Sequence, residues 1–105
     1  MGEKEKILKE ADRAASYKEV EAALAALSEL IEKMPGHEDL FYARAELYYK
    51  LNQYGQAIND YMRVLSINPD NKEAAGKIDI IKTILRFHNT DIYANPNTDM
   101  DPWLE

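Results

Sequence analysis

Apolar residues recur at helical spacing along most of the chain. Residues 49–69 show the pattern clearly, because large and small apolar side chains stand three or four residues apart and the run closes on a proline. This spacing places them on one face of a helix, and a proline cannot continue that helix. The positions are Tyr54, Ala57, Tyr61, Val64 and Pro69. The same pattern predicts five helices, near residues 3–15, 19–33, 38–51, 54–67 and 71–87.

The pattern repeats with a period of 34 residues, the distance from Pro35 to Pro69. The same offset relates apolar or small residues throughout the two units. The pairs are Ile7 and Phe41, Ala11 and Ala45, Ala14 and Tyr48, Val20 and Tyr54, Ala23 and Ala57, Leu27 and Tyr61, and Leu30 and Val64. Each unit therefore contains two helices, and small residues opposite bulky ones allow those helices to approach closely.

Residues 38–71 resemble the tetratricopeptide repeat family, whose unit is a helix-turn-helix of 34 residues. The residues that carry the resemblance are Phe41, Ala45, Tyr48, Tyr54, Ala57, Tyr61 and Pro69. Residues 4–37 match more weakly. The resemblance implies an all-α protein with a right-handed α-α superhelix. It would consist of two helix-turn-helix repeats at about 4–37 and 38–71 and a C-terminal capping helix at about 71–87, together forming a domain of residues 1–87.

Two features depart from a simple repeat. Arg44 stands where the family usually has Leu, and Val64 where it usually has Ala, so we expect looser or shifted packing there. The segment Ser16-Tyr17-Lys18-Glu19 matches a capping box, which would start the second helix three residues earlier than a gap-free alignment of the two units does. Both positions of that helix start remain open.

The last helix has an N-terminal capping signal and two apolar stripes. Asp70-Asn71 supplies the cap. One stripe, predicted to cover the preceding helix, consists of Ala75, Ile78, Ile81 and Leu85. The other consists of Ile80, Ile84 and Phe87, and a helix that is apolar on two sides is normally covered on both. A second copy of the chain, an unknown partner or the chain's own C-terminal tail could cover it.

Residues 88–105 form an acidic tail without helical periodicity, which we expect to be disordered or loosely docked. It carries four carboxylates and no Lys or Arg, and its apolar residues include Ile92, Tyr93 and Trp103. Repulsion from other carboxylates opposes docking along an acidic surface, whereas burial of those apolar side chains favours docking near the last helix.

Composition narrows the function. A chain of 105 residues has room for one modest core. The absence of cysteine excludes disulfides, thiolate zinc sites and cysteine nucleophiles. A net charge of −6 and a pI near 4.9 argue against nucleic acid as a partner. We see no signal peptide and no run of roughly 20 apolar residues, so we expect a cytoplasmic protein without membrane contact.

No pattern in the sequence indicates catalysis. His37 and His88 have no partner at the spacing of metal ligands, and the acidic residues of the tail lack the glycine and ligand number of a calcium loop. Nothing combines a nucleophile, a base and an orienting group. We therefore expect no enzyme, no catalytic residue, no cofactor and no metal.

The resemblance implies a binding groove, because in this family the first helix of each unit lines a concave surface that holds a peptide or a partner's helix. The corresponding residues here are Glu5, Leu8, Asp12, Asp39, Tyr42, Glu46, Tyr49, Lys50, Glu73, Ile80 and Ile84. Five are acidic and one is basic, which favours partners with Lys or Arg beside an apolar or aromatic anchor. A merely solvated charged face is the alternative for these residues.

One version of the family grips the carboxylate terminus of chaperones with Lys, Asn and Arg. The matching places here hold Leu8, Asp12, Ala43, Glu73 and Lys77, so we expect no binding of that kind. The sequence predicts a protein-interaction adaptor or scaffold whose partner it does not identify. The alternative is a structural protein that forms a homodimer through its last helix.

Overall fold

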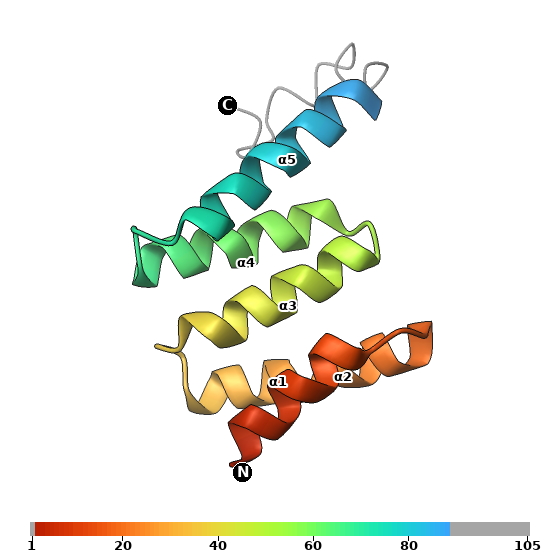
Figure 1. The fold of residues 1–105 in the computed structure, drawn as a ribbon, viewed down its shortest axis with the longest axis vertical. Helices are drawn as coiled ribbons and strands as arrows, with labels where there is room; N and C mark the ends of the chain where they lie inside the picture. Colours follow the sequence, from red (N-terminus) through yellow and green to blue (C-terminus); the bar gives the residue numbers. More distant parts are fainter. Residues whose placement is uncertain (1, 89–105) are drawn as a thin grey trace.

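The computed structural model describes residues 2–88, which form a stack of helices and contain no strand. Two antiparallel hairpins are followed by one further helix that packs on the second hairpin (Figure 1). The helices are α1 (Glu3–Arg13), α2 (Tyr17–Lys33), α3 (Glu38–Lys50), α4 (Tyr54–Ile67) and α5 (Lys72–His88). The prediction of an all-α repeat fold is confirmed, whereas the superhelical twist stays a prediction.

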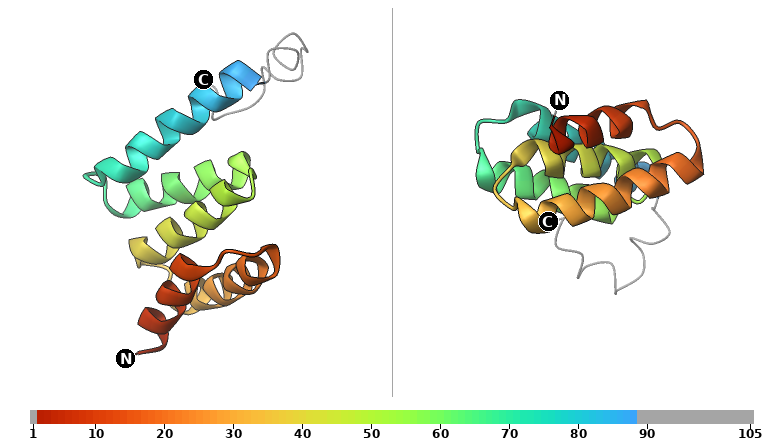
Figure 2. Two further views of the ribbon diagram at one scale, coloured as in Figure 1. Left: turned by 45° about the vertical axis from the view of Figure 1, so that its right-hand side comes forward. Right: turned by 90° about the horizontal axis from the view of Figure 1, so that it is seen from below.

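The helices contact their neighbours along the stack and few others. α3 packs on α4, α4 on α5, and α2 on α3, while α1 packs on both α2 and α3. The left view of Figure 2 shows this order from the N-terminal hairpin to α5. This is the arrangement that lets each unit bury an apolar face that it cannot bury alone.

The capping box at the start of α2 forms as one of the two sequence alternatives requires. The Ser16 hydroxyl oxygen accepts a hydrogen bond from the Glu19 N–H at 3.1 Å, and the Glu19 carboxylate accepts from the N–H groups of Ser16 and Ala15. α2 therefore begins at Tyr17 rather than near 19. α1 ends at Arg13, two residues before the predicted end.

The core follows the paired positions of the two units. Ala45, Ala57 and Tyr61 are fully buried in the second hairpin. Leu27, which corresponds to Tyr61, is equally buried in the first. The edge of one ring in the pair Tyr42 and Tyr61 meets the face of the other, with centroids 5.5 Å apart. Small residues opposite large ones thus allow close packing of α3 and α4.

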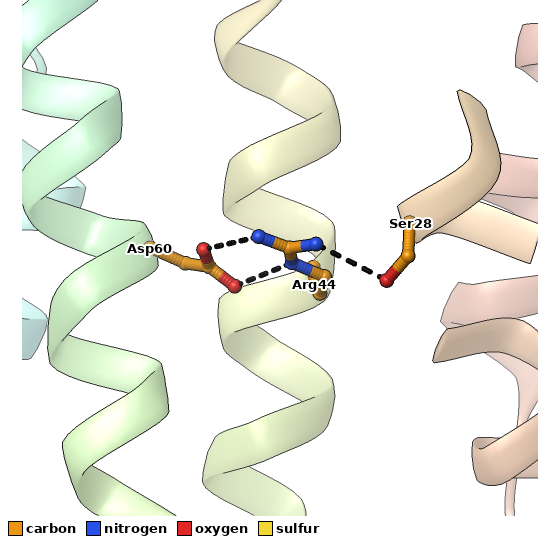
Figure 3. A network of polar contacts seen from close by, with 3 residues as sticks. All are labelled: Ser28, Arg44 and Asp60. Carbon is orange, nitrogen blue, oxygen red and sulfur yellow. Dashed lines mark hydrogen bonds and ion pairs between the residues drawn. The ribbon is translucent and has the colours of Figure 1, made fainter. Parts of the chain in front are cut away.

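Looser helix packing was expected at Arg44, but its side chain makes specific contacts with two neighbouring helices. Its guanidinium lies between α4 and α2, as Figure 3 shows, and it forms a two-pronged ion pair with Asp60, with Nε to Oδ2 at 2.7 Å and Nη2 to Oδ1 at 2.8 Å. Nη1 also donates to the Ser28 hydroxyl at 3.1 Å. One side chain therefore connects three helices through charge-assisted hydrogen bonds.

α5 is capped as predicted but presents a slightly different face. The Asn71 side-chain oxygen accepts a hydrogen bond from the Ala74 N–H at 3.0 Å. Ala74 is fully buried and Ala75 is exposed, so the prediction of Ala75 in the packed face was wrong. Both lie about one helical turn before Ile78, and sequence spacing alone does not choose between them. The helix also includes His88, so the segment beyond it begins at residue 89. The predicted contacts of Ile92, Tyr93 and Trp103 fall outside the described residues.

Candidate functional site

A hollow of about 470 Å³ opens between α1, α3 and the start of α5. Its apolar lining consists of Leu8, Ala11, Tyr42, Ala43 and Leu47. Its polar lining consists of Asp12, Glu38, Asp39, Glu46, Lys50, Asn71 and Glu73. We call this site the acidic hollow. It combines an apolar surface with five carboxylates and one ammonium group.

Seven of the eleven predicted groove residues line the acidic hollow. They are Leu8, Asp12, Asp39, Tyr42, Glu46, Lys50 and Glu73. The other four lie elsewhere. Glu5 is exposed on α1, and Tyr49 is half-buried with its ring 5.8 Å from that of Tyr54. Ile80 and Ile84 lie farther along α5, where Ile80 is 48% exposed. The role of all eleven residues in binding stays a prediction.

Five residues of the acidic hollow were not among the groove residues predicted from the sequence: Ala11, Glu38, Ala43, Leu47 and Asn71. Glu38 is held where one unit meets the next, since its Oε2 accepts hydrogen bonds from the side-chain amides of Asn68 and Asn71, at 3.1 and 2.9 Å. In the sequence, the two asparagines of the segment Asn68-Pro69-Asp70-Asn71 were the feature that could have indicated a polar contact at this junction. The 34-residue offset compares units and does not show which side chains meet at their junction.

Part of the charge in the acidic hollow is already compensated within the chain. Lys4 Nζ lies 2.8 Å from Asp39 Oδ2, and Lys77 Nζ lies 3.3 Å from Glu46 Oε1. The pairing with Asp39 also raises the pKa of Lys4. Within residues 2–88 the structure gives no ion-pair partner to Asp12, Glu38 or Glu73.

Lys50, the basic residue of the acidic hollow, stabilises the end of α1. Lys50 Nζ donates a hydrogen bond to the Ala14 carbonyl oxygen, at 3.0 Å, where α1 has just ended. A Lys ammonium in this place satisfies a carbonyl that the helix itself leaves unpaired. No ion pair compensates the negative charges at Asp12, Glu38 and Glu73, and Glu38 is held by the neutral amides of Asn68 and Asn71.

Tyrosines connect the acidic hollow to the core. The Tyr61 hydroxyl donates a hydrogen bond to Glu46. Burial raises the pKa of Tyr61, and the bond to Glu46 raises it further. Burial also raises the pKa of Tyr42, with added repulsion from the Glu46 and Glu73 carboxylates. Both phenols therefore remain protonated at neutral pH, and Tyr42 presents a neutral aromatic surface to the acidic hollow.

Lys77 joins α5 to this cluster. Besides its ion pair with Glu46, its ammonium lies 4.8 Å from the centroid of the Tyr49 ring, within the range of a cation–π contact. Glu46 thus connects α3 with Tyr61 on α4 and Lys77 on α5. This carboxylate holds helices together, which leaves it less available to a ligand than Asp12 or Glu73.

The described residues offer little else that could perform chemistry. Among residues 2–88, no group of three or more His, Cys, Asp or Glu side chains is arranged to hold a metal ion. Nor does that part of the chain contain a helix with the length and apolar character needed to cross a membrane. His37 is exposed at the start of α3, with Nδ1 3.1 Å from Lys4 Nζ.

The comparison with protein families agrees with the architecture. Residues 38–71, from the first residue of α3 to the N-cap of α5, match the family model of the tetratricopeptide repeat. This part of the chain is similar to a tetratricopeptide repeat. Residues 4–37 lie outside the match. Comparisons with curated proteins and with solved structures find no match.

The match to this repeat suggests a protein-interaction module in general terms, since proteins built from such repeats are generally non-enzymatic interaction modules. The fold alone does not identify a ligand, because function depends on the site that a fold carries.

Proposed function

We propose that this chain is a non-enzymatic adaptor or scaffold whose acidic hollow holds a peptide or helix with Lys or Arg beside an apolar or aromatic anchor. The observation that supports this proposal is the composition of the acidic hollow. Apolar side chains from α1 and α3 line it together with carboxylates, and three of these, Asp12, Glu38 and Glu73, have no ion-pair partner within residues 2–88.

An anchor in the acidic hollow would cover Leu8 and Tyr42, both half-buried in the free chain. Removing apolar surface from water contributes about 25 cal/mol per Å², so one large anchor provides most of the affinity. Basic residues beside the anchor would lie near Asp12 and Glu73. Charges at such an open site act mainly on specificity and on the rate of association.

A homodimer through α5 is the second candidate. The exposure of Ile80 (48%) and Phe87 (74%) favours some cover for this helix. However, α5 carries four basic and two acidic residues, so two copies packed face to face would bring like charges together. We therefore place an assembly role after the adaptor role.

Peptide binding to the full chain tests the proposal. Two labelled peptides would share one aromatic anchor, flanked by Lys and Arg in the first and by Glu in the second, and fluorescence anisotropy would measure each Kd. We expect only the basic peptide to bind. The double variant Asp12→Asn/Glu73→Gln should weaken this binding about tenfold, which corresponds to about 0.7 kcal/mol for each exposed pair.

The matched control is Glu29→Gln/Glu32→Gln on α2, because both residues are exposed and lie outside the acidic hollow. It changes the net charge by the same amount, so it corrects for long-range attraction. Equal losses in the two double variants would contradict binding in the acidic hollow. Preference for the acidic peptide would contradict the proposed partner chemistry.

A further inference from the structure

α5 presents a row of apolar side chains away from the helix that it packs on. Ile80, Ile84 and Phe87 lie at steps of four and three residues, so they share one face, which we call the α5 stripe. Ile80 is 48% and Phe87 74% exposed, whereas Ile78 and Ile81 are buried. Large apolar side chains grouped in this way usually mark a surface that is covered.

The α5 stripe is not the face on which a next repeat would continue. On α3 the face consists of Phe41 and Ala45, which are buried, and Tyr48, which packs against the core. At the positions 34 residues later α5 has Ala75, Asp79 and Lys82. Ala75 and Asp79 are exposed. Because this face is small or charged, it does not offer a next helix the packing surface that α3 offers to α4.

Charge distinguishes the possible covers. With four basic and two acidic residues α5 has a net charge of +2, whereas α1 to α4 each lie between 0 and −2. The C-terminal segment, residues 89–105, carries four carboxylates without Lys or Arg, a net charge of −4. It also contains Ile92, Tyr93 and Trp103. Its charge complements α5, while the α5 of a second copy repeats the same charge.

The length and position of residues 89–105 also favour this segment as the cover of the α5 stripe. It begins two residues after Phe87, and the axis of α5 rises only about 10 Å from Phe87 back to Ile80, at 1.5 Å per residue. About three extended residues cover that distance, and the C-terminal segment has 17. Because it is tethered beside the stripe, its effective concentration is of the order of millimolar, far above that of a second copy in dilute solution.

We infer that residues 89–105 fold back along α5 and cover the α5 stripe, with Ile92, Tyr93 and Trp103 against Ile80, Ile84 and Phe87. The carboxylates of the segment then lie near Lys82 and Arg86. This contact is intramolecular and does not depend on the binding of any partner in the acidic hollow.

The full chain contains one tryptophan, Trp103, so its fluorescence reports on the segment directly. We expect Trp103 to emit at shorter wavelength, and to be quenched less by acrylamide, than in a synthetic peptide of residues 89–105. The double variant Ile80→Gln/Phe87→Gln should shift emission and quenching to the values of the free peptide. Circular dichroism should show that the variant retains its helices, because Gln is a good helix former.

Met62→Gln is the matched control, since Met62 is 53% exposed on α4 and lies outside the α5 stripe. It should leave the fluorescence of Trp103 unchanged. Wild-type emission and quenching equal to those of the free peptide would overturn the inference. Protection of Trp103 that disappears on dilution would also overturn it, because it would identify a second copy as the cover.

Discussion

Arg44 shows how a charged residue is accommodated where the repeat family usually has an apolar one. The corresponding position of the first unit is Glu10, which is exposed, and Asp60 corresponds to Ala26. The ion pair therefore belongs to the second unit alone. Arg and Asp enter together, so the charge that one of them brings into the core is compensated by the other.

We predict that Arg44→Leu destabilises the chain although Leu is the family's usual residue. It would leave the carboxylate of Asp60, a residue that is 5% exposed, without its partner, at a cost of about 3 kcal/mol. The double variant Arg44→Leu/Asp60→Ala removes both charges and places in the second unit the residue that the first has at Ala26. It should recover most of the loss. Urea denaturation of the three proteins measures these differences, and equal instability of both variants would contradict the compensation.

At the level of single residues, the resemblance to the repeat family, rather than spacing alone, implied which side chains share a surface. Asp12, Tyr42 and Glu46 were expected to share a surface, and the structure places them around one hollow. Their partners were not predictable, because the bond between Tyr61 and Glu46 depends on how α3 and α4 rotate against each other. Spacing within a helix contains no information on that rotation.

At the level of elements, helix ends were predictable where a side chain caps them. The capping box of Ser16 and Glu19 offered the start of α2 at Tyr17 as one of two alternatives, and Asp70-Asn71 indicated the start of α5. The end of α1 at Arg13 has no such signal, and the helix was expected to be longer. The first hairpin thus turns at residues 14–16 and the second at 51–53, a shift of 37 residues rather than 34. This local difference explains the weaker likeness of the first unit.

The capping box makes the stability of α2 depend on pH. Backbone N–H groups of Ala15 and Ser16 donate to the Glu19 carboxylate and hold its pKa below the ordinary value. A lowered pKa in the folded state stabilises the protein above the unfolded-state pKa, about 4.3, and this contribution is lost as the pH falls through the folded-state value.

Glu19→Gln should therefore lower the free energy of unfolding at neutral pH, and the difference from wild type should shrink at about pH 3.3, one unit below the ordinary pKa of Glu. Urea denaturation at the two pH values measures it. Ser16→Ala removes the uncharged half of the box and should cost about 1 kcal/mol at both. A Glu19→Gln difference that grows in acid would show that the carboxylate bonds do not stabilise the cap.

At the level of the whole molecule, the 34-residue period predicted the stacking of two hairpins and a capping helix. It did so because each repeat is one supersecondary unit that buries its apolar face only against a neighbour. The shape of the acidic hollow was beyond this reasoning. It depends on the relative placement of α1, α3 and α5, which side-chain contacts such as the ion pair of Lys77 and Glu46 help to set.

Because each helix packs mainly on its neighbours in the stack, a destabilising substitution at one end of the molecule should have mainly local effects. α5 packs mainly on α4, and the principal helix contacts of residues 2–88 include none between α5 and the first hairpin. Ile81 in α5 and Leu27 in α2 are both fully buried, so each substitution by Ala should cost about 3 kcal/mol of contact energy. We predict that Ile81→Ala accelerates amide hydrogen exchange in α5 far more than in α1 and α2, and that Leu27→Ala does the reverse. Native-state exchange resolved by helix measures both variants at one pH. Equal acceleration in all five helices would show instead that the chain opens as a single cooperative unit, since a substitution then lowers the same global free energy everywhere.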